Sequence, residues 1–344
     1  MKTIQRAVGL NAALILSTML SPTGAANPAP KPATPVVQGT TQLAGGQGTL
    51  GKTVTLGKGR AAINFTLNSA EFTLARVTVG TNVYVPKADE KLLILRYTLQ
   101  NPQKESKDVS WNTLKFTAVD AQDTNHEHDN YVGRDGTSEQ LDMTLKPAQK
   151  INVYAVMAVP AAGPIPKLIV SAGDEFPVQR YDLRGKVKGL AAALADPKDP
   201  SFATAREVQT VANSTYAPLG KFDMKLDAAA LSPAAINGQT PPSGQRYLVA
   251  TLGLRNGTAK TAEAAEWTFN TFKFQLRNAD GEVQVYDDYL LKVARDETAN
   301  GTLKPGEEAR FRVYFLLPDN VAGSTLSVSE GESRTIAFSV SAAR

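Results

Sequence analysis

The sequence of 344 residues contains no cysteine at all, and only 7% of its residues are aromatic. Without cysteine there can be no disulfides, no thiolate metal sites, no thiol redox chemistry and no cysteine to carry a lipid anchor. Stability must therefore come from burial of apolar side chains and from strand pairing.

The chain also lacks a concentrated charge of either sign. The formal net charge is +4, and lysines and arginines are interspersed with aspartates and glutamates rather than gathered in a run. A nucleic-acid-binding protein usually carries a basic patch or stripe. Neither a phosphate-binding loop nor a dinucleotide-binding fingerprint occurs in the sequence. We therefore expect no nucleic acid as a partner.

The one long apolar run lies at the N-terminus. Lys2 and Arg6 precede an apolar stretch, Ala7–Leu20, and mostly small residues follow it up to Ala25-Ala26. This order is typical of a cleaved signal peptide over residues 1–26, and the run is too short to span a bilayer comfortably. We expect a secreted, periplasmic or cell-surface protein with no membrane span after signal cleavage; the alternative is a retained N-terminal anchor.

Residues 27–53 are rich in proline, alanine, threonine and glycine. Such a composition buries too little apolar surface to offset the entropy of ordering. It predicts a tether, stiffer in its proline-rich half and flexible in its glycine-rich half.

The remainder of the chain contains an internal repeat. Asn112–Pro160 aligns without a gap on Asn270–Pro318, 158 positions later. Within each copy, apolar residues alternate with polar ones, and Gly, Pro, Asn and Asp separate these segments. That pattern predicts short strands with one buried face. We expect an all-β protein with two tandem immunoglobulin-like β-sandwich domains, at residues 54–183 and 216–344.

The segment between the copies, residues 184–215, has a different pattern. Val187, Leu190, Ala191 and Leu194 have helical spacing, and Asp196-Pro197 would end that helix. A second short helix is expected over Thr204–Val211. The segment therefore reads as a partly helical linker.

Three pairs of segments occur in the same order in both copies: Leu92–Asn101 with Leu248–Asn256, Leu114–Phe116 with Phe272–Phe274, and Leu145–Pro160 with Leu303–Pro318. This order of strands and turns resembles a bacterial secreted family of immunoglobulin-like domains of unknown function, related in fold to the immunoprotective extracellular antigen. The likeness covers roughly residues 60–183 and 216–341. The first copy departs from the pattern at Ala148-Gln149, where Gly-Glu is usual. The resemblance implies an exported, non-catalytic sandwich that is often attached to the cell envelope.

Both histidines of the protein lie close together, as His126 and His128. On a strand they point to the same face, where two imidazoles can share a divalent metal if a neighbouring strand supplies a third ligand. The alternative is a solvated polar face next to a hairpin turn. We expect no cofactor, and a divalent metal at these histidines is the alternative.

The two tryptophans, Trp111 and Trp267, permit a carbohydrate-binding interpretation if their rings are exposed; packing against the core is the other interpretation. Nothing near the histidines resembles a nucleophile elbow, so we do not expect an enzyme. The expected function is a binding or interaction module for a protein or a cell-envelope component. The alternatives are a metal-binding protein using His126 and His128, and a carbohydrate- or cell-wall-binding module.

Overall fold

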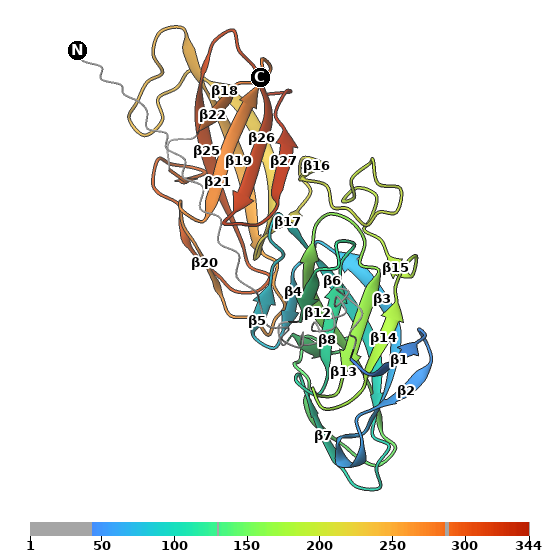
Figure 1. Cartoon of the computed structure of the whole chain (residues 1–344). Coiled ribbons are helices and arrows are strands. Elements are labelled where there is room, and N and C mark those ends of the chain that lie inside the picture. Colours follow the sequence, from blue (N-terminus) through green and yellow to red (C-terminus); the bar gives the residue numbers. More distant parts are fainter. Residues whose placement is uncertain (1–42, 129–130, 286–288, 344) are drawn as a thin grey trace, which may run out of the picture. The chain divides into compact units, whose positions relative to one another are not determined.

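The computed structural model describes residues 43–128, 131–285 and 289–343, and within them the protein is all-β, as predicted (Figure 1). The described residues hold no α-helix, only one short 3-10 turn, Gly59–Ala61. Among the same residues, no helix is long and apolar enough to cross a membrane. The predicted signal peptide and the tether up to residue 42 lie outside the described residues.

The strands of residues 43–188, which we call the N-terminal sheet group, form two main sheets. One has the order β1-β14-β13-β8-β9, and the other has the order β10-β12-β6-β3-β15, with β2 paired to β3. Two two-stranded sheets, β4 with β5 and β7 with β11, complete the group. The bounds are β1 Gly45–Gly48, β2 Thr53–Leu56, β3 Ile63–Thr73, β4 Val77–Val79, β5 Asn82–Tyr84, β6 Glu90–Gln100, β7 Lys107–Ser110, β8 Lys115–Val119, β9 Asn125–Glu127, β10 Val132–Arg134, β11 Asp142–Leu145, β12 Lys150–Pro160, β13 Lys167–Ser171, β14 Val178–Asp182 and β15 Val187–Lys188.

The core of this group lies between its two main sheets. In β6, Leu93, Leu95, Tyr97 and Leu99 are buried on one face, as their alternation predicted. The ring of Phe65 on β3 lies 5.2 Å from that of Tyr97, and further aromatic contacts reach the opposite sheet. Aromatic packing of this kind adds to the burial of apolar area that stabilises the sandwich.

The strands of residues 208–339, the C-terminal sheet group, repeat this plan. The two main sheets have the orders β16-β27-β26-β21-β22 and β17-β18-β19-β25-β23, and β20 pairs with β24. The bounds are β16 Val208–Val211, β17 Ala217–Leu219, β18 Phe222–Ser232, β19 Gln245–Asn256, β20 Ala265–Trp267, β21 Phe272–Asn278, β22 Val283–Val285, β23 Leu291–Lys292, β24 Gly301–Leu303, β25 Glu308–Pro318, β26 Gly323–Glu330 and β27 Thr335–Ser339.

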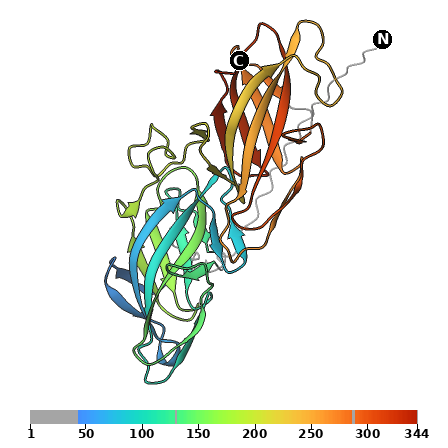
Figure 2. The same ribbon diagram turned by 180° about the vertical axis from the view of Figure 1, so that it is seen from behind.

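The sequence repeat corresponds to matching strands. Strand β12 and strand β25 are 158 positions apart, and each pairs antiparallel along its length with the preceding long strand, β6 or β19 (Figure 2). Each group has its own main apolar cluster, and in the described part of the chain no sheet contains strands of both groups. Residues 43–344 nevertheless form one compact unit, so the division into two domains stays a prediction.

The predicted helices of residues 184–215 are wrong. This segment consists of turns and two short strands: β15 pairs in parallel with β3 at Ala70 and Glu71, and β16 pairs in parallel with β27. Of the apolar residues that suggested a helix, Leu190 is buried in the N-terminal core, Val187 and Leu194 pack against this core, and Ala191 is exposed. Sheet edges with unpaired backbone groups offer the hydrogen bonds that a helix would otherwise supply.

The glycine-rich end of the predicted tether also differs from the prediction. Gly45–Gly48 forms edge strand β1, which pairs in parallel with β14. A Cβ atom on Gly48 would lie 2.4 Å from the ring of Tyr181, so glycine permits a close approach that a larger residue would block. In Gly45–Gly48, the glycines allow the backbone to pair closely with β14 and do not form a flexible tether.

Candidate functional site

His126 is held by the turn that precedes its strand. Its Nε2 lies 2.9 Å from Asp120 Oδ2, and the other oxygen of that carboxylate accepts the backbone N–H groups of Gln122 and Thr124. The contact with His126, followed by these backbone hydrogen bonds, lowers the pKa of Asp120 below its ordinary value. The histidine thus completes a hydrogen-bonded hairpin turn.

His128 has a different environment. Its ring meets Phe116 edge-on at a centroid distance of 5.3 Å, and its Nδ1 accepts the N–H of Phe116 at 3.4 Å. In the described part of the chain, no three His, Asp or Glu side chains come together as metal ligands would. The third ligand that a metal site at His126 and His128 requires is therefore not present among these residues.

Neither tryptophan forms an exposed platform. Trp267 is only 4% exposed and its ring lies 5.4 Å from that of Phe311 in the C-terminal core. Trp111 is half-buried and packs on the N-terminal core. The carbohydrate alternative therefore loses the exposed aromatic ring on which it depended.

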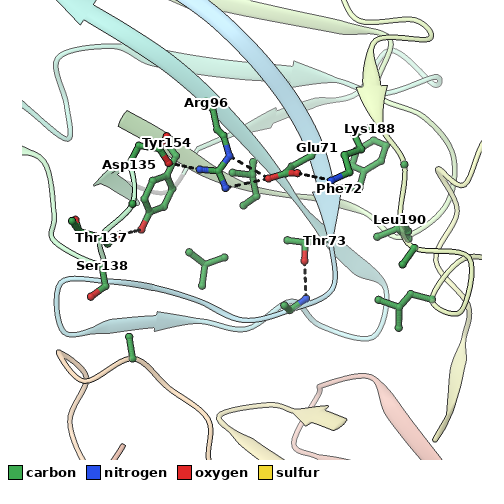
Figure 3. A pocket seen from close by; sticks show the side chains of 18 residues that line it. Glu71, Phe72, Thr73, Arg96, Asp135, Thr137, Ser138, Tyr154, Lys188 and Leu190 are labelled. Atoms are coloured by element: carbon green, nitrogen blue, oxygen red, sulfur yellow. Dashed lines mark hydrogen bonds and ion pairs between the residues drawn. The ribbon is translucent and has the colours of Figure 1, made fainter. Parts of the chain in front are cut away.

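A pocket lies on the outer face of the sheet that contains β3, β6 and β12 (Figure 3). We call it the β3–β6 pocket. Its volume is about 880 Å³. Because successive side chains of a strand point to opposite faces, Ile94 and Arg96 of β6 face the pocket while Leu95 and Tyr97 face the core. On β6, the pocket thus uses the positions that alternate with those facing the core.

One wall of the pocket is a row of paired charges. Arg96 donates to Glu71 Oε1 through Nε at 3.3 Å and Nη2 at 3.2 Å, and through Nη1 to Asp135. Lys188 Nζ lies 3.6 Å from Glu71 Oε2 (Figure 3). The arginine therefore lies between two carboxylates, and one of these also faces a lysine.

The remaining walls are mainly apolar. Val77 and Ile94 line the sheet side, and Leu190 and Leu194 come from the segment after β15. The ring of Tyr154 also lines the pocket, and its hydroxyl is 3.3 Å from two backbone carbonyl oxygens, to which it can donate. Segments 71–77, 135–138 and 188–194 meet only in the folded chain. The helical spacing of Leu190 and Leu194 predicted one face of a helix, and no sequence pattern indicated this pocket.

Close to the pocket, Arg76 links the two sheet groups. Its guanidinium donates to the carbonyl oxygens of Gly220 at 2.7 Å and Phe222 at 2.5 Å, and pairs with Asp223 Oδ1 at 2.5 Å. Arg255 binds the other oxygen of Asp223 at 2.7 Å. We call Arg76, Asp223 and Arg255 the Arg76 clasp.

The Arg76–Asp223 pair of the clasp is buried. The side chains of Arg76 and Asp223 are 8% and 10% exposed, whereas that of Arg255 is 38% exposed. A Cβ atom on Gly257 would lie 1.9 Å from Arg76 Nη1, so a side chain at this position would displace the guanidinium from its hydrogen bonds. Two residues later, the N–H of Ala259 donates to Thr78 Oγ1 at 3.3 Å, and Ala259 also lines the β3–β6 pocket. The C-terminal sheet group therefore contributes to the rim of the pocket.

Comparison with known proteins finds matches among solved structures, each over part of this chain. No protein-family model and no curated protein matches the sequence. Among solved structures, a β-sandwich protein from Clostridium difficile 630 is similar at 12% identity and a TM-score of 0.31, covering 42% of this chain and 97% of its own. The secreted protein MPT63 from Mycobacterium tuberculosis is similar at 16% identity and a TM-score of 0.29, covering 38% and 95%. The yjhA protein of Bacillus subtilis has 15% identity and a TM-score of 0.28, covering 39% and 98%.

Proposed function

We propose that the protein is an exported, non-enzymatic binding protein, placed outside the cytoplasm by a signal peptide over residues 1–26. Its binding part consists of two tandem immunoglobulin-like sandwiches of the secreted family described above, at residues 54–183 and 216–344, joined by residues 184–215. The internal repeat and the separate apolar cluster of each sheet group support this division.

The observation that carries the binding function is the β3–β6 pocket. Pockets that hold small molecules usually measure roughly 300–1,000 Å³, are mostly apolar and contain a few placed polar groups. With a volume of about 880 Å³, apolar side chains from the sheet and from residues 188–194, and one polar wall, the pocket has this character. Most of its lining comes from residues 71–194, and Ala259 of the C-terminal sheet group lies at its rim.

The same residues favour binding over catalysis. Glu71, Asp135, Arg96 and Lys188 are the charged groups of the wall, and each of the two carboxylates lies within ion-pair distance of a cation. A general base must be able to accept a proton from a substrate, and a carboxylate that already pairs with arginine is poorly suited to that role. None of the described residues that line the pocket is a histidine.

Export is tested by expressing the full chain with a C-terminal tag in a bacterium, fractionating the cells and sequencing the N-terminus of the exported form. We expect a mature chain that begins at Ala26 or Asn27. Tagged protein that stays in the cytoplasm with residues 1–26 attached would contradict the proposal.

Binding is tested with Prodan, an uncharged naphthalene dye whose emission shifts in apolar surroundings. Ala191 is exposed and lines the pocket, so Ala191→Trp fills the pocket without disturbing the core. Ala234 is exposed and lies outside the pocket, so Ala234→Trp is the matched control. We expect saturable binding by the wild type and the control that is lost in Ala191→Trp. Equal binding by all three proteins would contradict a ligand site in this pocket.

A further inference from the structure

We infer that the ligand of the β3–β6 pocket is an uncharged small molecule with an apolar body. This inference rests on the proposed binding function and concerns the chemistry that the walls of the pocket select. It follows from the balance of charges, from the hydrogen bonds already made by the polar groups, and from the apolar side chains that line the remaining walls.

The charges that line the pocket cancel. The wall contains two cationic side chains, Arg96 and Lys188, and two anionic ones, Glu71 and Asp135. Each cation lies within ion-pair distance of a carboxylate. An ionic ligand would lose its hydration on entering the pocket and would find no unpaired counter-charge there. If it drew one partner out of an existing ion pair, the other charge of that pair would be poorly compensated. An uncharged ligand meets neither cost.

The neutral polar groups around the pocket are also engaged. The Thr137 hydroxyl donates to the carbonyl of Arg134 at 3.0 Å, and the Thr73 hydroxyl accepts the N–H of Ala75 at 3.0 Å. The Ser138 hydroxyl lies 2.9 Å from that of Thr261. Each of these hydroxyls already makes at least one hydrogen bond, and that of Thr137 has used its only proton, so the new hydrogen bonds open to a ligand are few.

Apolar contact then remains as the main source of affinity. Ile94 and Val77 line the pocket together with Leu190 and Leu194 from the segment after β15. Burial of an apolar ligand surface between these side chains is favourable and roughly proportional to the area removed from water. The apolar body of the ligand is expected to lie against these side chains, with any hydroxyl or amide directed toward the mouth.

The test uses three probes with the same body and different charge: naphthylmethanol, naphthoate and naphthylmethylammonium. Each competes with Prodan for the wild-type full-length mature protein. We expect naphthylmethanol to displace Prodan best and the two ions to bind about tenfold more weakly, a difference of about 1.4 kcal/mol. Binding of naphthylmethanol should change little with salt, because it involves no ion pairing.

A charge-altering variant makes the test sharper. Glu71→Gln removes the carboxylate that faces both Arg96 and Lys188, and should raise the affinity for naphthoate about tenfold. Glu263 is exposed and outside the pocket, so Glu263→Gln is the control and should leave naphthoate binding unchanged.

The outcomes separate this inference from the proposed function. If Prodan binds the wild type and is lost in Ala191→Trp, but an ionic probe competes as well as naphthylmethanol, the ligand class is wrong and the site stands. The same conclusion follows if Glu71→Gln and Glu263→Gln bind naphthoate equally. If Prodan shows no saturable binding to the wild type, the proposed site itself is overturned.

Discussion

The carboxyl group of Glu330 provides a quantitative test of how burial changes a pKa, and with it the stability of this fold. Glu330 is the last residue of β26, and its Oε2 accepts the backbone N–H of Lys221 at 2.9 Å. A Cβ atom on Gly220 would lie 1.8 Å from the same oxygen, which shows how closely the chain packs over this carboxylate. Loss of solvent around the carboxylate raises the pKa of Glu330 from its ordinary value of 4.5 to about 7, against the opposing effects of the Lys221 N–H and the charge of Arg76.

The size and sign of the effect follow from this pKa. The folded chain holds the proton of Glu330 more tightly than the unfolded chain, so the associated stabilisation is complete below about pH 4.5 and is lost as the pH rises through about 7. The difference between the two pKa values corresponds to about 3 kcal/mol. Glu330→Gln is neutral at every pH and retains an oxygen to accept the N–H of Lys221. Relative to wild type, the variant should be about equally stable near pH 4.5 and about 3 kcal/mol more stable near pH 8.

The assay is urea unfolding followed by the fluorescence of Trp267, which lies in the core of the same sheet group. Trp111 is the only other tryptophan, so Trp111→Phe is introduced into every protein compared. Glu307→Gln is the matched control, because Glu307 is exposed and its side chain also accepts a backbone N–H, that of Lys304 at 2.8 Å. A stability difference between Glu330→Gln and the wild type that is the same at both pH values would refute the reasoning.

Three further predictions concern buried contacts. Gly257→Ala is expected to destabilise the protein by about 2–4 kcal/mol, because the new Cβ would occupy the place of Arg76 Nη1; an unchanged melting temperature would contradict this. His126→Ala is expected to raise the pKa of Asp120, and with it the pH at which acid begins to destabilise the hairpin; NMR titration of the Asp120 carboxyl checks this, and an identical pKa in both proteins would refute it. Lys91→Met should cost about 3 kcal/mol in thermal unfolding, because the fully buried ammonium donates to three backbone carbonyls, of which only that of Ala161 keeps another donor, the N–H of Ala205; wild-type stability would show that the other two carbonyls find new donors.

The candidate site was only partly predictable from the sequence. The histidine pair was noticed because histidine is rare in this chain, but the hydrogen bond between His126 and Asp120 depends on how the hairpin turn folds. No sequence motif marked the β3–β6 pocket. Glu71 and Arg96 are ordinary outward residues of two strands, and their pairing depends on the register that sets Ala70 opposite Leu95. Registers are fixed by turns and packing between strands, which local patterns do not encode fully.

Residues 184–215 show why the spacing of apolar residues wrongly predicted helices. Four apolar residues at helical spacing also suit an irregular segment that covers the end of a sheet, and a short apolar pattern does not distinguish the two. What decided the outcome was a distant partner: the backbone of Val187–Lys188 pairs with β3, more than one hundred residues earlier. The same applies to Gly45–Gly48, whose flexible composition did not reveal the open edge of β14.

The sequence by itself determined the long strands, the faces they bury and the repeat that relates β12 to β25, because alternation of apolar side chains is a local property of a strand. It also excluded disulfides, through the absence of cysteine. Only the tertiary structure decided the partners of the sheet edges, the Arg76 clasp and the β3–β6 pocket. Each of these joins segments far apart in the chain, and their contacts arise from packing between elements rather than from the order of residues within one.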